Sequence, residues 1–160
     1  MKNARFKHDE IYKQEQSLEF CHFNHDDALK LGLSIIENSK KYSEPVALAI
    51  TLNGLEVFRY FAQGAIPDSV LWLKRKNNSI QLMRMSTLRF FYWLDMLGYT
   101  LDDRKLDVTE YAAAGGGFPI SIMGTGVIGS VCVSGLTDHL DDHALVVDSI
   151  KEYLMTQSDT

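Results

Sequence analysis

Residues 111–135 constrain the fold most, because they hold seven of the eleven glycines in this 160-residue chain. Three consecutive glycines, Gly115, Gly116 and Gly117, give a backbone without Cβ atoms that can adopt positive φ and lie against another group. Two apolar runs follow, at residues 118–123 and 127–133, and the glycine-rich turn between them predicts a buried β-hairpin. Turn chemistry leaves only residues 115–119 unexplained, so we interpret this short loop as the rim of a site or of a subunit contact.

The order of the other patterns predicts an α+β domain. They favour helices at residues 8–17, 24–41, 67–98 (one long helix, with or without a kink) and from 138 onward, and strands at 18–23, 46–52 and 55–61. Asn53-Gly54 joins the last two strands, because both residues tolerate the positive φ of a tight hairpin turn. Hairpins connected by helices favour a mainly antiparallel sheet with flanking helices. We expect one domain over residues 1–160, with 1–17 as an N-terminal helical extension.

Composition limits the class of function. A net charge of −5 provides no broad basic face for phosphate groups, which argues against nucleic acid as a partner. The N-terminus has no apolar segment after its basic residues, and no run of eighteen apolar residues occurs. We therefore expect a cytoplasmic protein without membrane insertion.

No common catalytic motif is present. Residues 124–129 match G-x-G-x-x-G, but they lie inside the predicted hairpin, whereas a dinucleotide site needs this motif between a strand and a helix. G-x-S-x-G is absent, and Cys132 lies in an apolar strand where a thiol is normally inert. The catalytic residues therefore stay unknown.

His139 and His143 are four residues apart and share one face of the last predicted helix. Two imidazoles at this spacing can bind a metal ion, with Asp138 or Asp142 as a further ligand. The alternative is that they are solvated residues of a first helical turn. Because no third histidine or cysteine lies nearby in sequence, we assign no metal site.

Lys74, Arg75 and Lys76 place positive charge on the long predicted helix. Such groups can hold carboxylates or phosphates, and arginine does so with two parallel hydrogen bonds. The alternative is a solvated helix face. The cluster matters for binding only if it faces the glycine loop.

Several segments together resemble the GlcG/HbpS-like haem-degrading family, and most closely its cytoplasmic, uncharacterised branch. They are LNGLEVF, PDSVLWLKRKNN, EYAAAGGGFPI, VIGSVCVSGL and DDHALVV, and they span nearly the whole chain. The resemblance implies a profilin-like three-layer α/β/α sandwich on a five-stranded antiparallel sheet. It also implies ring-like or stacked homo-oligomers. Some relatives bind haem or related tetrapyrroles, some are credited with degrading haem, and a eukaryotic relative is linked to targeting of tail-anchored membrane proteins.

The chain departs from this family at two positions. Where relatives commonly carry a histidine before the double glycine, this chain has Ala114, and Met85 replaces another histidine in the long helix. Alanine cannot bind iron or transfer a proton, and methionine offers only a soft thioether. These replacements lower the expectation of an enzyme.

Two functions therefore stay open, with a weaker third. The first is binding of a small molecule, with haem or another tetrapyrrole as the named candidate. Its expected ligand-binding residues are Gly115, Gly116, Gly117, Phe118, Pro119, Lys74, Arg75 and Lys76. The second is a non-catalytic homo-oligomeric assembly or interaction module in which the glycine loop packs between subunits. The third is an enzyme acting on a small carboxylate, for which no base or nucleophile can be named.

Overall fold

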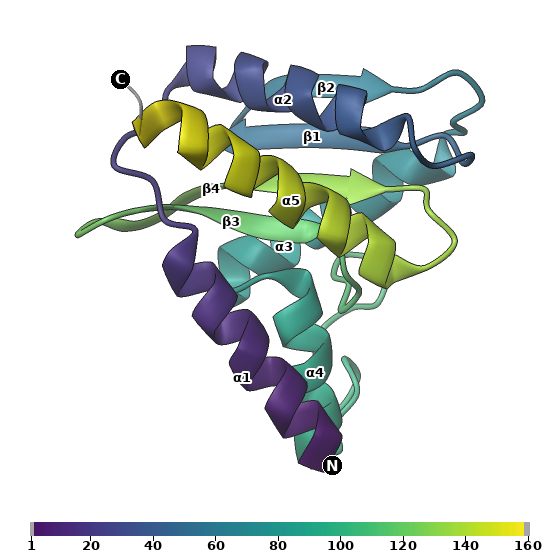
Figure 1. The fold of residues 1–160 in the computed structure, drawn as a ribbon. Coiled ribbons are helices and arrows are strands. Elements are labelled where there is room, and N and C mark those ends of the chain that lie inside the picture. The colour runs from purple at the N-terminus through teal and green to yellow at the C-terminus, as the bar shows by residue number, and fades with distance from the viewer. Residues whose placement is uncertain (1, 159–160) are drawn as a thin grey trace.

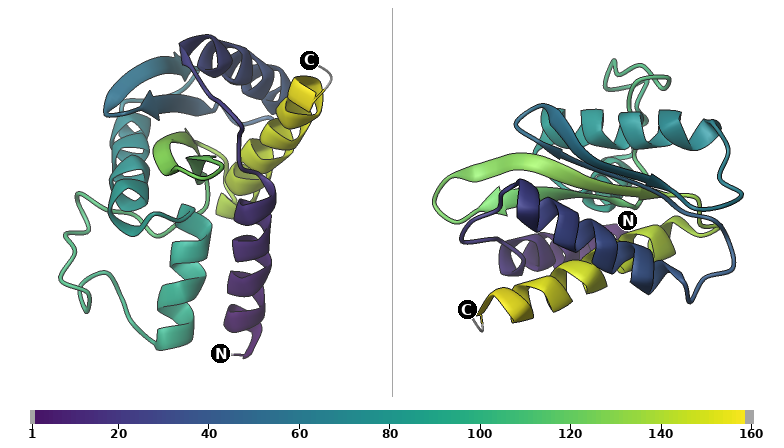
Figure 2. Two further views of the ribbon diagram at one scale, coloured as in Figure 1. Left: turned by 90° about the vertical axis from the view of Figure 1, so that its left-hand side faces the viewer. Right: turned by 90° about the horizontal axis from the view of Figure 1, so that it is seen from above.

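A computed structural model describes residues 2–158, which form five helices and a four-stranded antiparallel sheet (Figure 1). The elements are α1 Lys2–Ser17, α2 His25–Ser39, β1 Ala47–Leu52, β2 Leu55–Phe61, α3 Asp68–Met83, α4 Thr87–Leu97, β3 Gly117–Ile122, β4 Gly126–Ser134 and α5 His139–Ser158. The strands lie in the order β2-β1-β4-β3. Helices α2 and α5 cover one face of the sheet and α3 covers the other (Figure 2). The predicted α+β class is therefore confirmed.

Side-chain alternation on the central strands separates two apolar layers of unequal thickness. On β1, Leu48 and Ile50 join the large core under α2 and α5, whereas Ala47 and Ala49 face α3. The cluster under α3 is small and otherwise contains Leu73, Ile80 and Cys132. The face under α3 therefore has room for cavities.

The sheet has four strands within residues 2–158, so the expected five-stranded sheet is wrong. The missing strand is the one predicted at residues 18–23. Only Phe20 in this segment pairs with the sheet, through a single parallel bridge to Ile122. Its N–H donates to Ser121 O at 2.8 Å and its carbonyl accepts from Met123 N at 2.9 Å. One bridge does not extend into a ladder, because the chain turns at Asn24 to begin α2.

The long helix expected at residues 67–98 is two helices. Helix α3 ends at Arg84, which has the left-handed φ of 58° and donates its N–H to Ile80 O at 2.8 Å. Ser86 then begins α4, its hydroxyl accepting a hydrogen bond from Arg89 N at 3.1 Å. This break lets α4 leave the sheet and lie beside α1 (Figure 2, left).

Helix α1 is longer than the predicted segment 8–17 and is attached to α4 by a partly buried ion pair. Glu15 Oε2 lies 2.9 Å from Arg89 Nε and also accepts from Ser86 N at 3.2 Å. No helix within residues 2–158 is both long and apolar enough to cross a membrane.

Candidate functional site

A cavity of about 270 Å³ lies between α3, the segment that follows β4, and the first turn of α5. We call it the Lys76 cavity. Its polar side chains are those of Asp68, Ser69, Lys76, Ser134, Thr137, His139 and Asp142. Trp72 and Ala114 contribute apolar surface. The cavity thus gathers ionisable groups from segments far apart in the sequence, which makes it the best candidate site.

Lys76 is the most unusual residue of the cavity, because its side chain is charged at ordinary pH and yet only 2% of the residue is exposed. Its Nζ atom donates a hydrogen bond to Val133 O at 2.7 Å and lies 3.7 Å from Asp142 Oδ2. Burial lowers the pKa of Lys76, and the nearby Asp142 carboxylate opposes this effect. An ammonium has three N–H donors, so these contacts leave Lys76 capacity for a ligand.

Asp142 is the partner of this lysine and is also buried. Its Oδ1 atom accepts a hydrogen bond from Leu136 N at 3.3 Å. Burial raises the pKa of Asp142 to about 7, although Lys76 acts in the opposite direction. The two groups therefore form one coupled pair, in which burial disfavours both charges and each ionised partner favours the charged form of the other.

His139 is oriented by the glycine loop. Gly115 N donates to His139 Nδ1 at 2.9 Å, so Nδ1 carries the lone pair and the proton of the neutral ring is on Nε2. The ring also packs edge-on against Phe91 with centroids 5.0 Å apart. Burial lowers the pKa of His139, which keeps the ring neutral.

His143 faces a different neighbour. Its Nε2 atom lies 2.7 Å from Gln14 Oε1 of α1, and its buried Nδ1 has no hydrogen-bond partner among the described residues. Burial lowers the pKa of His143 to about 4. Within residues 2–158, no group of three or more histidine, cysteine, aspartate or glutamate side chains could hold a metal ion.

The glycine loop is packed against residues that line the cavity, among them Lys76, His139 and Asp142. A Cβ atom on Gly115 would lie 2.3 Å from His139 O, and one on Gly116 would lie 2.3 Å from Val133 O and 2.7 Å from Lys76 Nζ. Gly116 also has a φ of 127°. Gly117, Phe118 and Pro119 are buried at the start of β3. The loop is thus placed beside the cavity, while its role in ligand binding stays a prediction.

The predicted basic cluster is divided among three environments. Lys76 lines the cavity, whereas Lys74 pairs with Glu110 at 3.2 Å. Arg75 donates to Thr109 O at 3.2 Å, and its guanidinium lies over the Trp72 ring at 5.0 Å. The structure therefore does not bring the three side chains together around one ligand.

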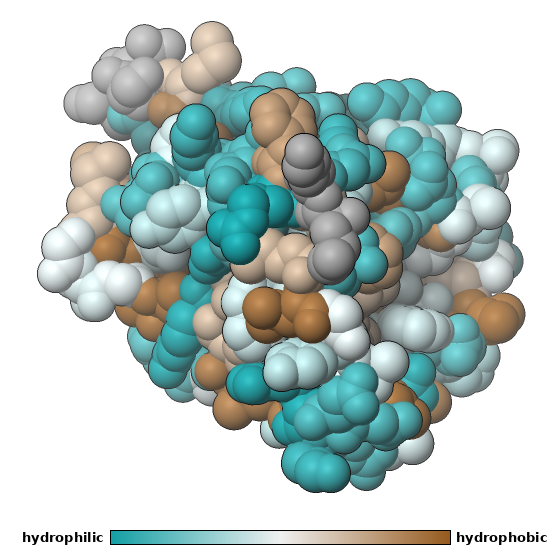
Figure 3. Space-filling model, turned by 90° about the horizontal axis from the view of Figure 1, so that it is seen from below, coloured by the Kyte–Doolittle hydropathy of each residue, from teal (hydrophilic) through white to brown (hydrophobic). Residues whose placement is uncertain are grey.

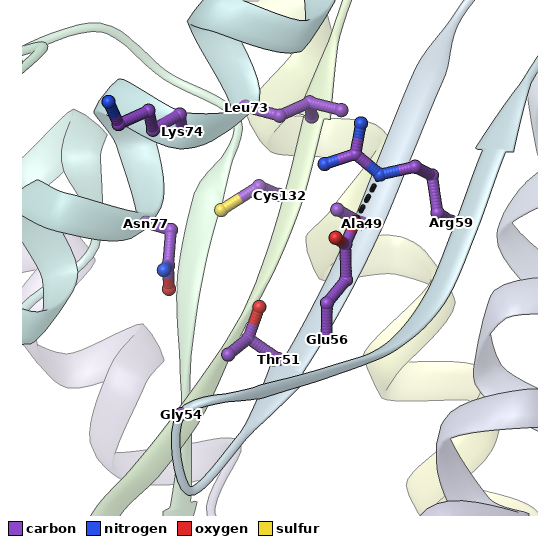
Figure 4. Close-up of a pocket in the computed structure, with 9 residues that line it drawn as sticks. All are labelled: Ala49, Thr51, Gly54, Glu56, Arg59, Leu73, Lys74, Asn77 and Cys132. Atoms are coloured by element: carbon purple, nitrogen blue, oxygen red, sulfur yellow. Dashed lines mark hydrogen bonds and ion pairs between the residues drawn. The ribbon is translucent and has the colours of Figure 1, made fainter.

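Lys74 instead lines a second cavity, of about 200 Å³, between α3 and the sheet (Figure 4). Glu56 and Arg59 of β2 form an ion pair on one side of it, and Asn77 lies on the other. Cys132 points into the space, but burial raises the pKa of its thiol to about 11, so it is not a nucleophile. Glu56 pairs with Arg59 and Lys74 pairs with Glu110, and all of these side chains are exposed, which makes this cavity the weaker candidate.

Ala114, at the position where the family resemblance led us to expect a histidine, lines the Lys76 cavity. Met85, by contrast, lies in the break between α3 and α4 and does not line this cavity.

Sequence reasoning did not place Asp142, Ser69, Ser134 or Trp72 in the ligand site. One signal was available for Lys76 and Ser69: both fall on the helical stripe of the buried residues Leu73 and Ile80. A lysine on an apolar stripe indicates either a buried partner or a site.

The fold and the cavity define an antiparallel-sheet domain, helix-covered on both faces, with a buried lysine–carboxylate pair at the end of a central strand. Residues 23–151 match the family described as "Haem degrading protein HbpS-like", and the chain belongs to that family. A UPF0303 protein of Streptomyces avermitilis is 35% identical over 146 residues, which cover 91% of this chain and 89% of that protein.

Two solved structures show the same fold. The Ybr137w protein superimposes with a TM-score of 0.85 at 25% identity, covering 94% of this chain and 88% of that one. A structure described as a PduOC:heme complex superimposes with a TM-score of 0.64 at 17% identity, covering 79% of this chain and 94% of that one. The second similarity concerns the fold alone.

Proposed function

We propose that the protein binds a small polar molecule in the Lys76 cavity. The observation that carries this proposal is a buried lysine on the cavity wall whose ammonium donates to Val133 O and pairs with the Asp142 carboxylate at 3.7 Å, two contacts for three N–H donors. A buried ammonium is costly unless its donors are satisfied, and a ligand would satisfy the remaining one. The volume of about 270 Å³ lies just under the usual lower limit of roughly 300 Å³ for ligand pockets, which favours a small metabolite.

The family description and the haem complex of PduOC make haem a candidate ligand for this protein. The cavity does not fit haem iron. His139 is the imidazole available there, and its Nδ1 lone pair is occupied by Gly115 N while Nε2 carries the proton. Ligation needs a free lone pair on the outer nitrogen, so iron binding would break this arrangement. We therefore favour an organic ligand without a metal.

Fluorescence of Trp72 tests the proposal, because this ring lines the cavity. The Trp93→Phe variant removes the other tryptophan, and the protein is titrated with small polar metabolites of about two to four carbon atoms. We expect saturable quenching by at least one compound, and its loss in a Trp93→Phe, Ser69→Leu double variant. Native mass spectrometry of protein isolated from its own cells identifies any retained ligand.

Absence of both a retained ligand and saturable quenching at millimolar concentration would overturn the proposal. Haemin, followed at its Soret band, is the comparison ligand. A saturable Soret shift at micromolar concentration that disappears in a His139→Gln variant would show that haem occupies this site after all.

Homo-oligomeric assembly is the second candidate, and a specific surface favours it. Strand β2 is at an edge of the sheet, next to an apolar depression formed by Phe61, Ala65, Ile66, Pro67 and Val70. Free strand edges and apolar patches are common sites of association. On the lower face of the molecule, by contrast, apolar residues are scattered among hydrophilic ones (Figure 3).

Light scattering tests this candidate. We expect the mass of the wild-type particle to exceed one chain and to fall in a Phe61→Ser, Val70→Ser variant. The control is Leu33→Ser, which alters an apolar residue of α2 that is even more exposed than Phe61 and Val70. A monomeric wild type, or an unchanged mass in the double variant, would exclude this surface.

A further inference from the structure

We propose that Lys76 Nζ forms an imine with a small hydroxyaldehyde or hydroxyketone in the Lys76 cavity, with Asp142 moving the proton. This inference rests on the proposed binding function and adds a covalent step to it.

The geometry supports an oriented amine. The amino group of Lys76 donates a 2.7 Å hydrogen bond to Val133 O of β4. This bond fixes the position of the Nζ atom. A carboxyl oxygen of Asp142 lies 3.7 Å from the same nitrogen. An amine beside a carboxyl group, both on the wall of a small cavity, is the arrangement that carbonyl condensation requires.

The protonation states are favourable as well. Only a neutral amine attacks a carbonyl, and burial lowers the pKa of Lys76. The carboxyl group of Asp142, with its pKa raised to about 7, is partly protonated at neutral pH and can act as an acid. The other titratable groups at Lys76 are His139, kept neutral by burial, the Cys132 thiol, and Asp68 on the cavity wall.

The reaction is a condensation without oxidation or reduction. The lone pair of Nζ adds to the carbonyl carbon, and the carbonyl oxygen takes the proton of Asp142 to give a carbinolamine. The nitrogen returns a proton to the Asp142 carboxylate. Asp142 then protonates the hydroxyl group, the C–O bond breaks, water leaves and the C=N bond forms.

The lining indicates an uncharged, hydroxylated substrate. The hydroxyl groups of Ser69 and Ser134 line the cavity and have no hydrogen-bond partner within the described residues, so they are available to substrate hydroxyls. The charge of Lys76 is balanced by Asp142, and Asp68 adds negative charge, which disfavours anions. A hydroxylated compound of two to four carbons fits the volume.

Reductive trapping tests the inference on the intact protein. Glycolaldehyde is added at pH 7 with cyanoborohydride, which reduces an imine to a stable secondary amine, and the modified lysines are located by peptide mass spectrometry. Lys74 is the internal control, because it lies on the same helix but is exposed and paired with Glu110. Burial lowers the pKa of Lys76 and so raises the fraction of its amine that is neutral, and we expect Lys76 to be labelled faster than the exposed Lys74.

Labelling of Lys76 should fall about tenfold or more in Asp142→Asn, while labelling of Lys74 stays the same. If that variant does not fold, the wild-type comparison of Lys76 with Lys74 decides alone. Equal labelling of the two lysines, or none at Lys76, would overturn the inference. Saturable Trp72 quenching by glycolaldehyde without a Lys76 adduct would leave the binding function standing and remove the imine. Loss of both would also remove the imine, and the binding function would then be decided by the metabolite titration and the search for a retained ligand.

Discussion

His143 is a buried histidine whose ring is held neutral by the protein. Its pKa is lowered from 6.5 to about 4, so the folded state resists a proton that the unfolded state accepts. Its contribution to stability is therefore complete above pH 6.5 and is lost as the pH falls toward 4. One pKa unit corresponds to about 1.4 kcal/mol, which makes the full loss about 3 kcal/mol.

Urea denaturation at several pH values checks this prediction. Between pH 6.5 and 4 the wild type should lose about 3 kcal/mol more than the His143→Gln variant, which cannot titrate at this position. His25→Gln, at the exposed start of α2, is the control and should follow the wild type. Parallel profiles of wild type and His143→Gln would contradict the assignment.

Gly116 tests whether the glycine loop is fixed by packing. Its φ of 127° and the contacts of 2.3 Å and 2.7 Å that a Cβ would make lead us to expect that Gly116→Ala costs about 3 kcal/mol or more. Gly124→Ala is the matched control, because Gly124 also has a positive φ, 77°, but has open space around it. This substitution should lower the free energy of unfolding by only about 1 kcal/mol. Similar free energies of unfolding for the two variants would show that the close approach does not matter.

Lys74, Arg75 and Lys76 show why the site could be predicted only in part. Successive residues of a helix point about 100° apart, so three adjacent cations cannot share one ligand when the helix lies against a sheet. Lys76 could be selected from the apolar stripe on which it lies. Its partner Asp142 could not, because the pairing depends on how α5 packs against β4.

The connection between α3 and α4 is held by Glu15 of α1. This carboxylate bonds Arg89 Nε and Ser86 N, and it is mostly buried. Removing one partner of a buried ion pair costs roughly 3–5 kcal/mol, so we expect Glu15→Ala to release α1 from α4. Hydrogen exchange should show lost protection in α1 while the β1 and β4 amides stay protected.

Glu37→Ala is the control for this prediction. Glu37 pairs with Lys40 at 2.8 Å, but both side chains are exposed, and exposed pairs contribute about 1 kcal/mol or less. Protection in α1 should therefore not change. Simultaneous loss of protection in α1 and in the sheet after Glu15→Ala would indicate that α1 unfolds only with the whole protein.

Among the helices and strands, the sequence predicted best those features that depend on local turn residues, such as the two hairpins. Asn53-Gly54 located one hairpin, and the two apolar runs on either side of a glycine-rich turn located the other. The break at Arg84 has one weak sequence signal, the helix-capping residue Ser86, because an arginine gives no indication of the left-handed conformation that it adopts here. The strand expected at residues 18–23 failed because its pairing with β3 is limited by where α2 begins.

The whole molecule is built from a thick and a thin layer on opposite faces of one sheet. Two neighbouring residues of β4 lie in different layers: Val133 belongs to the large core and Cys132 to the small cluster under α3. We expect Val133→Ala to cost about 2–3 kcal/mol and Cys132→Ala about 1 kcal/mol or less, since water can enter beside the latter. Chemical denaturation measures both, and equal costs would contradict the two-layer description.

The hydrogen bond between His143 and Gln14 has a consequence for how the N-terminal helix behaves. Docking of α1 and proton uptake at His143 oppose each other, because the docked helix helps to exclude water from that ring. By thermodynamic reciprocity, acid loosens α1, and anything that pulls α1 away makes His143 more basic.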